Sequence, residues 1–250
     1  MTPYLLAADS RYLPVKPHIA KLLYLDFPRR YNYNHSGIFI PRNDYDNYLF
    51  ACLRSCLRLA DYPSYILIFT DHRHRTLVDR TITEKCCEPV VKYDHEIIWH
   101  YNFGVYTRHR FVPSHETILV YKKGKPKFNW EDVAVVSQRQ EANDSRADWR
   151  GRTPGDVLSI SRVSGKSMER RHFIDKESRS CQPEELVTIL IKAFSQKGDL
   201  VVDPFLGGGV TALVCRRLER RFIGWDICEN YVNEVAFRLN DWVSKVERMK

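Results

Sequence analysis

Residues 197–211 read KGDLVVDPFLGGGVT and decide the fold of this 250-residue chain. A turn signal, Lys197-Gly198, opens the apolar run Leu200-Val201-Val202, which ends at Asp203. Three glycines, Gly207 to Gly209, then precede a helix-like stretch. A strand, a glycine loop and a helix form the opening half of a nucleotide-binding α/β unit. Because glycine tolerates left-handed backbone angles and leaves room beside the main chain, the loop is a candidate ligand site.

A second strand strengthens this interpretation. Residues 221–225 form an apolar run that ends at Asp226, close to the spacing at which such folds place an acid on a pair of ribose hydroxyls. The glycine loop itself matches neither G-x-x-x-x-G-K-[ST] nor G-x-G-x-x-G. The unpaired N–H groups at the start of the following helix suit an electronegative ligand group.

Asp203 to Gly209, followed after one helix by Arg221 to Asp226, resembles the S-adenosylmethionine (SAM) site of amino-group DNA methyltransferases. These enzymes methylate the exocyclic amine of adenine or cytosine. The resemblance implies that Asp203 and the glycine loop hold the methionine part of SAM, that Asp226 holds the ribose and that Phe205 packs near the cofactor. The family usually carries Gln-Lys-Pro before the preceding helix, where Gln182 and Pro183 remain and the Lys is absent. The cofactor positions implied are Asp203, Pro204, Phe205, Gly207, Gly209, Thr211, Asp226 and Gln182.

A second motif follows the apolar run at residues 21–25. It reads Asp26-Phe27-Pro28-Arg29, and ligands of open α/β sheets bind beyond the carboxyl ends of strands. In the family this place carries Asp/Asn/Ser-Pro-Pro-aromatic: the polar side chain and the next carbonyl hydrogen-bond the target amine, and the ring stacks on the flipped base. Asp26 and Pro28 match, whereas Phe27 replaces the first proline and Arg29 replaces the aromatic residue. These four are the predicted catalytic residues.

Arg29 leaves four alternatives open. Its guanidinium plane could stack on a base in place of the ring. Phe27 or Tyr31 could supply the stacking surface instead. Arg29 could pair with an extra carboxylate on a modified SAM donor, because arginine binds carboxylates in a bidentate fashion. The fourth alternative is loss of catalysis.

Regular hydrophobic patterns predict the rest of the sheet and its helices. Residues 65–70 are a near-continuous apolar strand of the kind that is covered on both faces. Apolar residues at helical spacing from Asp44 predict a helix with Cys52 and Cys56 in the core. Further elements are expected as strands at 4–8, 96–100 and 116–121, and as helices at 76–82, from Pro183 and at 230–249.

Regular periodicity fades between residues 125 and 180, where arginines are scattered among polar residues. We expect the target-recognition insertion there, because arginines reach guanine edges and phosphates. The alternative is an exposed, salt-bridged insertion, since acidic residues offset part of its charge. The predicted nucleic-acid contacts, two of them on the preceding 101–115 loop, are Arg108, Arg110, Arg139, Arg150, Arg152 and Arg162.

The motif order, with the catalytic strand first and the cofactor loop last, is that of one permuted class of these methyltransferases. The resemblance implies an α/β fold with a doubly wound, mostly parallel sheet, divided into a catalytic half (1–124), the insertion (125–180) and a SAM-binding half (181–250). It implies direct methyl transfer to a flipped base, with Asp26 favouring adenine N6 over cytosine N4. A transferase of a larger group and an inactive SAM- or DNA-binding protein remain the alternatives.

Composition agrees with a nucleic-acid partner. The net charge of +8 and the pI near 9.1 are compatible with a polyanion, here double-stranded DNA. No apolar run of about eighteen residues or signal peptide is present, and seven cysteines without regular spacing favour a reduced, cytoplasmic protein without a metal site. A homodimer, a cognate restriction nuclease and the recognition sequence stay open.

Overall fold

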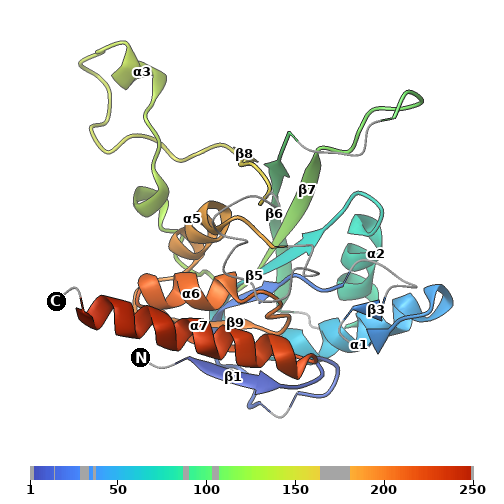
Figure 1. The fold of residues 1–250 in the computed structure, drawn as a ribbon. Helices are drawn as coiled ribbons and strands as arrows, with labels where there is room; N and C mark the ends of the chain where they lie inside the picture. Colours follow the sequence, from blue (N-terminus) through green and yellow to red (C-terminus); the bar gives the residue numbers. More distant parts are fainter. Residues whose placement is uncertain are drawn as a thin grey trace.

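The computed structural model describes residues 3–13, 15–28, 34–35, 38–86, 90–102, 107–163 and 181–248. Its centre is an eight-stranded sheet in the order β1-β10-β9-β2-β5-β7-β6-β8 (Figure 1). Only β7 runs antiparallel to its neighbours. The expected mostly parallel, doubly wound sheet is confirmed. The strands are β1 (Tyr4–Ala7), β2 (Ala20–Leu25), β5 (Ala60–Thr70), β6 (Val91–His100), β7 (His115–Lys123), β8 (Val157–Ser159), β9 (Leu200–Asp203) and β10 (Arg221–Asp226), beside a short pair β3 (Asn34–His35) and β4 (Ile38–Phe39).

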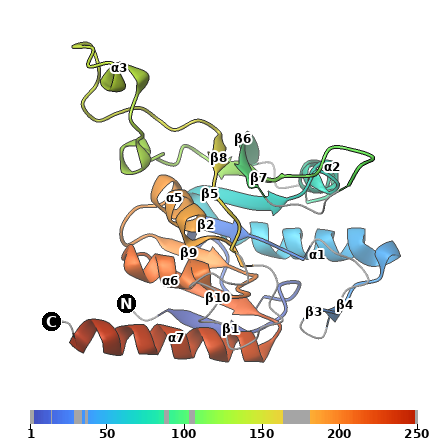
Figure 2. The same ribbon diagram turned by 45° about the horizontal axis from the view of Figure 1, so that its top comes forward.

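Helices cover both faces of this sheet (Figures 1 and 2). One face packs against α5 (Glu184–Phe194), α6 (Val210–Arg217) and α7 (Glu229–Arg248). The other packs against α1 (Tyr45–Leu57) and α2 (Arg75–Arg80), which continues as a π turn over Thr81–Lys85. The central strands are buried on both faces, as continuous apolar runs require. Cys52 and Cys56 lie fully within the α1 core, as expected.

The site is positioned by a switch in strand order. β9 and β2 are neighbours in the sheet, although they lie far apart in the sequence. The chain continues from β2 to β5 on one side and from β9 to β10 on the other, and β1 lies beyond β10. Ligands of doubly wound sheets bind at such a switch, beyond the carboxyl ends of the two strands, and this place is the candidate crevice of the protein. Asp203 ends β9 and Asp26 directly follows β2, so both predicted motifs meet at this carboxyl end of the sheet.

Two connections project from opposite ends of the sheet (Figure 1). The first is the connection from β6 to β7, described for residues 101–102 and 107–114, which follows the carboxyl end of β6, the end that carries the crevice. The insertion instead begins after Lys123, which pairs with Ser64 and Val91 near the starts of β5 and β6. Its described part contains a 3₁₀ turn (Trp130–Val133) and the one-turn helix α3 (Gln138–Glu141). The irregularity expected from residue 125 is therefore confirmed for residues 125–163.

Two expected boundaries differ from the structure. Pro183 is extended, with ψ at 135°, and its carbonyl accepts the bond from Val187, so it caps α5 and the helix begins at Glu184. The helix expected over 76–82 ends at Arg80, where the backbone widens into the π turn. In the described part of the chain, no helix is long and apolar enough to cross a membrane.

Candidate functional site

The glycine loop after β9 depends on backbone angles that other residues rarely adopt. Gly207 and Gly209 have φ values of +46° and +70°. Gly209 caps the start of α6, and a Cβ on it would lie 2.4 Å from Cγ2 of Val235 on α7. Position 209 therefore needs glycine for two reasons. Its backbone is left-handed, and α7 packs into the space that a side chain would fill.

We expect Gly209→Ala to destabilise the protein by about 2 to 4 kcal/mol, from left-handed strain and overpacking against Val235. Urea unfolding followed by circular dichroism measures the loss. The matched control is Gly198→Ala, because Gly198 also has a positive φ, +85°, but no atom lies within 4 Å of the added Cβ. Equal losses in the two variants would contradict a role for the Val235 contact.

Asp203 is a buried carboxylate, 3% exposed, at the end of β9. Its Oδ1 accepts a 2.9 Å bond from the Phe205 N–H, and its Oδ2 accepts the Thr211 hydroxyl. Burial raises the pKa of Asp203 to about 7, helped by the charges of Asp26 and Asp226 and opposed by these two hydrogen bonds. A cation beside Asp203 would reverse that rise, so the crevice is suited to a positively charged ligand group.

Asp226 and α7 hold the loop from its other side. The Asp226 carboxylate accepts bonds of 2.9 Å from the N–H groups of Gly207 and of Cys228. Arg238 of α7 donates to the Gly208 carbonyl. Hydrogen bonds thus hold four predicted cofactor residues around this loop, joining Asp203 to Thr211 and Gly207 to Asp226.

Asp26 lies in the same crevice, bound to the third predicted segment. Gln182 Nε2 donates a 2.8 Å hydrogen bond to Asp26 Oδ2. The Pro28 carbonyl accepts the Tyr45 hydroxyl at 2.9 Å, so α1 supports the end of the motif. The structure therefore brings together the start of the catalytic motif and the Gln182 segment, while Arg29 and Tyr31 lie outside the described residues.

Phe27 is placed differently from one of the expected alternatives. Its side chain is 1% exposed and makes an edge contact with Phe205, at 6.1 Å between ring centroids. The reason is strand alternation, because Leu23, Leu25 and Phe27 all point to the α1 face. The ring belongs to the core, and in this arrangement it presents no surface for stacking on a base.

A pair of polar residues, Asp71 and His74, follows the end of β5 and contacts Tyr45 of α1. His74 Nδ1 lies 2.8 Å from Asp71 Oδ1, and the His74 ring packs against Tyr45. Burial opposes ionisation of Asp71, but the hydrogen bonds and charge of His74 together hold its pKa at about 2. The polar loop expected after β5 is confirmed, and among the described residues no group of three or more His, Cys, Asp or Glu is placed to hold a metal.

Sequence reasoning missed the part of the site formed by the first strand. Ser10 donates to the Pro204 carbonyl and accepts a 3.0 Å bond from Trp225 Nε1, so the N-terminal segment locks both cofactor motifs together. Asp9, beyond the end of β1, is paired with Arg11. The available signal was the acid that closes β1, as acids close β9 and β10.

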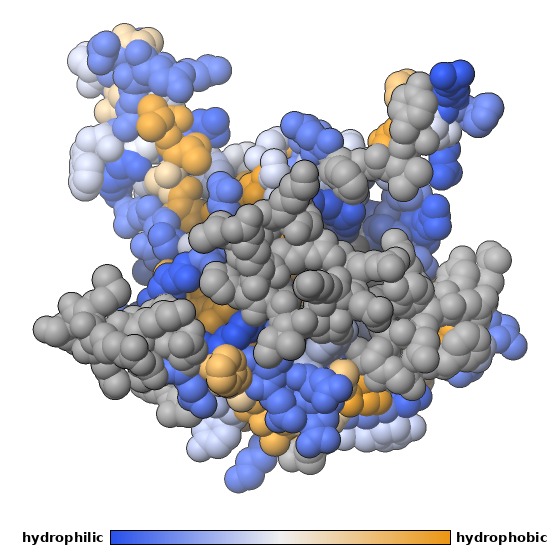
Figure 3. Space-filling view, viewed as in Figure 1, coloured by the Kyte–Doolittle hydropathy of each residue, from blue (hydrophilic) through white to orange (hydrophobic). Residues whose placement is uncertain are grey.

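Five of the six predicted nucleic-acid contacts lie on the two projecting connections, both of which carry hydrophilic residues (Figure 3). Arg108 and Arg110 are exposed on the 101–114 connection at the carboxyl end of the sheet, beside the fully exposed Phe111. Arg139, Arg150 and Arg152 lie on the insertion, which leaves the sheet at its amino end. Of these five, only Arg108 and Arg110 start from the end of the sheet that carries Asp26, and the sixth, Arg162, follows β8 at that same end.

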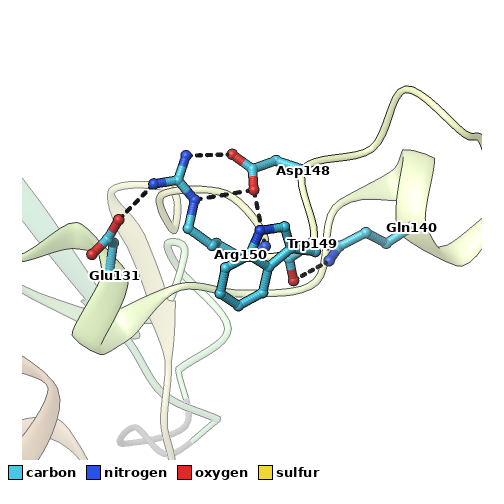
Figure 4. A network of polar contacts seen from close by, with 5 residues as sticks. All are labelled: Glu131, Gln140, Asp148, Trp149 and Arg150. Carbon is cyan, nitrogen blue, oxygen red and sulfur yellow. Dashed lines mark hydrogen bonds and ion pairs between the residues drawn. The ribbon is translucent and has the colours of Figure 1, made fainter.

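The insertion is also less basic in effect than its arginines suggest. Arg150 pairs with Asp148 and Glu131 at 2.8 Å (Figure 4). Its guanidinium also lies over the ring of Trp130. Residues 125–163 carry seven basic and six acidic residues. The salt-bridged alternative therefore describes this tip well, although Trp149 is 86% exposed there.

Arg162, beyond β8, is engaged within the protein. It donates a 2.6 Å bond to the buried Glu116 and lies 4.3 Å from the ring centre of Tyr101. Trp99 Nε1 donates to the Ile160 carbonyl at 2.8 Å. These contacts fasten the returning insertion to the edge of the sheet, which is a structural use of the arginine.

A family model described as DNA methylase matches residues 3–237. The type II methyltransferase M.HpaI of Haemophilus parainfluenzae is 28% identical over 215 residues, covering 83% of this chain and 65% of M.HpaI. The DNA adenine methyltransferase YhdJ of Escherichia coli K12 is 24% identical over 248 residues, covering 93% and 80%. The first curated relatives are thus longer than this chain, which spans less than two thirds of their length. The crystal structure of an M1.HpyAVI–SAM complex superposes with a TM-score of 0.64 at 18% identity, covering 96% of this chain and all of that one.

Proposed function

The chain belongs to the N6/N4 DNA methylase family, and on that premise we propose that it methylates an exocyclic base amine of double-stranded DNA with SAM as cofactor. We infer adenine N6 rather than cytosine N4 as the target, from the acid at position 26 and the similarity to an adenine methyltransferase. The observation that carries the proposal is the meeting of Asp26 and Asp203 at the carboxyl ends of the adjacent strands β2 and β9.

The cofactor residues fit a cationic ligand. SAM supplies an electrophilic methyl group on a positively charged sulfur. Asp203 would hold its ammonium group, and Asp226 its ribose hydroxyls. The glycine loop gives the ligand close access to the main chain, with Pro204, Phe205 and Thr211 shaping its wall. Burial raises the pKa of Asp203, and the charges of Asp26 and Asp226 add to this rise, so a cation beside Asp203 would be favoured.

Asp26 would act on the other reactant. A base amine is a poor nucleophile because its lone pair is delocalised into the ring. Hydrogen bonds from the amine to the Asp26 carboxylate and to the Phe27 carbonyl favour the pyramidal amine and stabilise positive charge as it develops. The base reaches these groups only after it leaves the helical stack.

For DNA contact we propose a division of labour. Arg108 and Arg110 project from the end of the sheet that carries the crevice, so they would bind the phosphates next to the flipped base. Residues 125–180 would form the target-recognition insertion between the catalytic half, 1–124, and the cofactor half, 181–250. Arg139, Arg150 and Arg152 would contact DNA only along a longer path, since they lie on the part that leaves the amino end.

The test is mass spectrometry of nucleosides from DNA incubated with the purified protein and SAM. We expect one added methyl group on adenine, and the control reaction contains the Asp203→Asn variant. A methyl group on cytosine would correct the base, and an added group larger than methyl would favour the modified donor and a role for Arg29. Binding of both SAM and DNA without any mass gain, on DNA of diverse sequence, would contradict the proposal and indicate an inactive relative.

A further inference from the structure

Tyr24 and Asp26 face the same side of the sheet. They stand two residues apart at the end of β2, so alternation directs both towards the α5 face. The Tyr24 side chain is 1% exposed, and its ring lies 4.9 Å from Phe69 between centroids. The buried hydroxyl therefore has a fixed position and needs a hydrogen-bond partner.

Gln182 supplies that partner and also binds Asp26. The Tyr24 hydroxyl donates to Gln182 Oε1, while Gln182 Nε2 donates to Asp26 Oδ2 at 2.8 Å. One primary amide thus uses its acceptor and its donor on two side chains of one strand. Gln182 immediately precedes Pro183, the cap of α5, so its backbone is held by the helix.

We propose that Tyr24 and Gln182 are positioning residues that set the orientation of the Asp26 carboxylate for the target amine. This inference rests on the proposed function. In this proposal Gln182 acts on the catalytic residue Asp26, whereas the family resemblance in the sequence implied that Gln182 contacts the cofactor.

The two hydrogen bonds from Tyr24 to Gln182 and from Gln182 to Asp26 form a relay, and the chemistry of the three side chains sets which group donates in each. Burial, with the charge of Asp26 next, raises the pKa of Tyr24 well above its usual value, so the hydroxyl keeps its proton and remains a donor. With Oε1 fixed by that donor, the amide can turn only its N–H towards Asp26. The bond from Gln182 to Oδ2 restricts the rotation of the Asp26 carboxylate, and pre-orientation of this kind is what transition-state hydrogen bonding requires.

The test is a double-mutant cycle on the intact protein. We expect Gln182→Leu to lower kcat for methyl transfer about tenfold or more and Tyr24→Phe about threefold, with dissociation constants for SAM and DNA within about twofold. In the Gln182→Leu background, Tyr24→Phe should have almost no further effect, because it acts only through Gln182. Tyr65→Phe is the matched control, since the Tyr65 hydroxyl donates to Pro126 away from the crevice.

A second readout needs neither cofactor nor DNA. In ¹⁵N NMR spectra of the free protein, the side-chain amide of Gln182 should exchange slowly and should shift on either Tyr24→Phe or Asp26→Asn. Fully additive losses of kcat, or an amide signal that responds to neither change, would overturn the relay. Absence of methyl transfer by the wild type would instead count against the proposed function, and the amide signal would still decide the relay.

Discussion

Replacing Asp203 by Asn is expected to abolish SAM binding and yet to stabilise the cofactor-free protein at pH 8. The carboxyl is buried at the end of β9, and burial, with the charges of Asp26 and Asp226, raises its pKa to about 7 from 3.8. Above pH 7 the Asp203 carboxyl is ionised in both states, but ionisation is less favourable in the folded protein than in the unfolded chain. The charge therefore destabilises the folded protein. A rise of about three pKa units corresponds to about 4 kcal/mol, of which the neutral amide recovers a part.

The pH dependence has a definite sign. Between about pH 4 and pH 7 the folded state keeps a proton on Asp203 that the unfolded state has released, so its contribution to stability falls as pH rises. SAM binding should follow the opposite course and strengthen as pH rises through 7, because only the ionised carboxylate pairs with an ammonium group.

Thermal unfolding from pH 5 to 9 and isothermal titration with SAM measure both effects. Asp46→Asn is the control, because Asp46 is an exposed acid in the first turn of α1. A lower Tm for Asp203→Asn at pH 8, or SAM binding equal to that of the wild type, would show that Asp203 is a structural acid and not a cofactor ligand.

Replacing Asp26 by Ala is expected to lower methyl transfer by about a thousandfold or more while SAM still binds. The change removes the proposed acceptor for the target amine and leaves the loop around Asp203 intact. It also removes one of the charges that raise the pKa of Asp203, so the pH at which SAM binding strengthens should move downwards.

Single-turnover transfer and titration with SAM distinguish these effects. Asp71→Ala is a demanding control, because Asp71 also follows a central strand but pairs with His74. Turnover by Asp26→Ala near the wild-type rate would exclude the assigned mechanism. Loss of SAM binding in this variant would show that Asp26 serves the cofactor instead.

The sequence predicted those features of the fold that depend on neighbouring residues. Apolar runs closed by an acid identified β2, β9 and β10, because hydrophobic periodicity and strand-ending residues are local signals. Strand alternation is also a local signal, and it predicts that Phe27 is buried because Leu23 and Leu25 are core residues on the same face.

Long-range pairing explains what could not be predicted. The insertion starts at the amino end of the sheet because β7 runs antiparallel to β5, and this orientation depends on contacts between residues 47 to 59 positions apart, from Thr70–Thr117 to Ser64–Lys123. Likewise, no local pattern shows that Gln182 binds Asp26, 156 positions away. The ion pairs of Arg150 with Glu131 and of Arg162 with Glu116 also join residues far apart in the sequence, so only the folded chain shows them.

The order of the strands has a consequence during synthesis. Among the described strands β1 pairs only with β10, and Ser10 binds Trp225, 215 positions further along the chain. A ribosome therefore releases β1, and the β9-facing edge of β2, long before their partners exist. Unpaired strand edges favour association with other chains. Recombinant expression should depend on completing α7, and fragments that end before β9 should accumulate as aggregates.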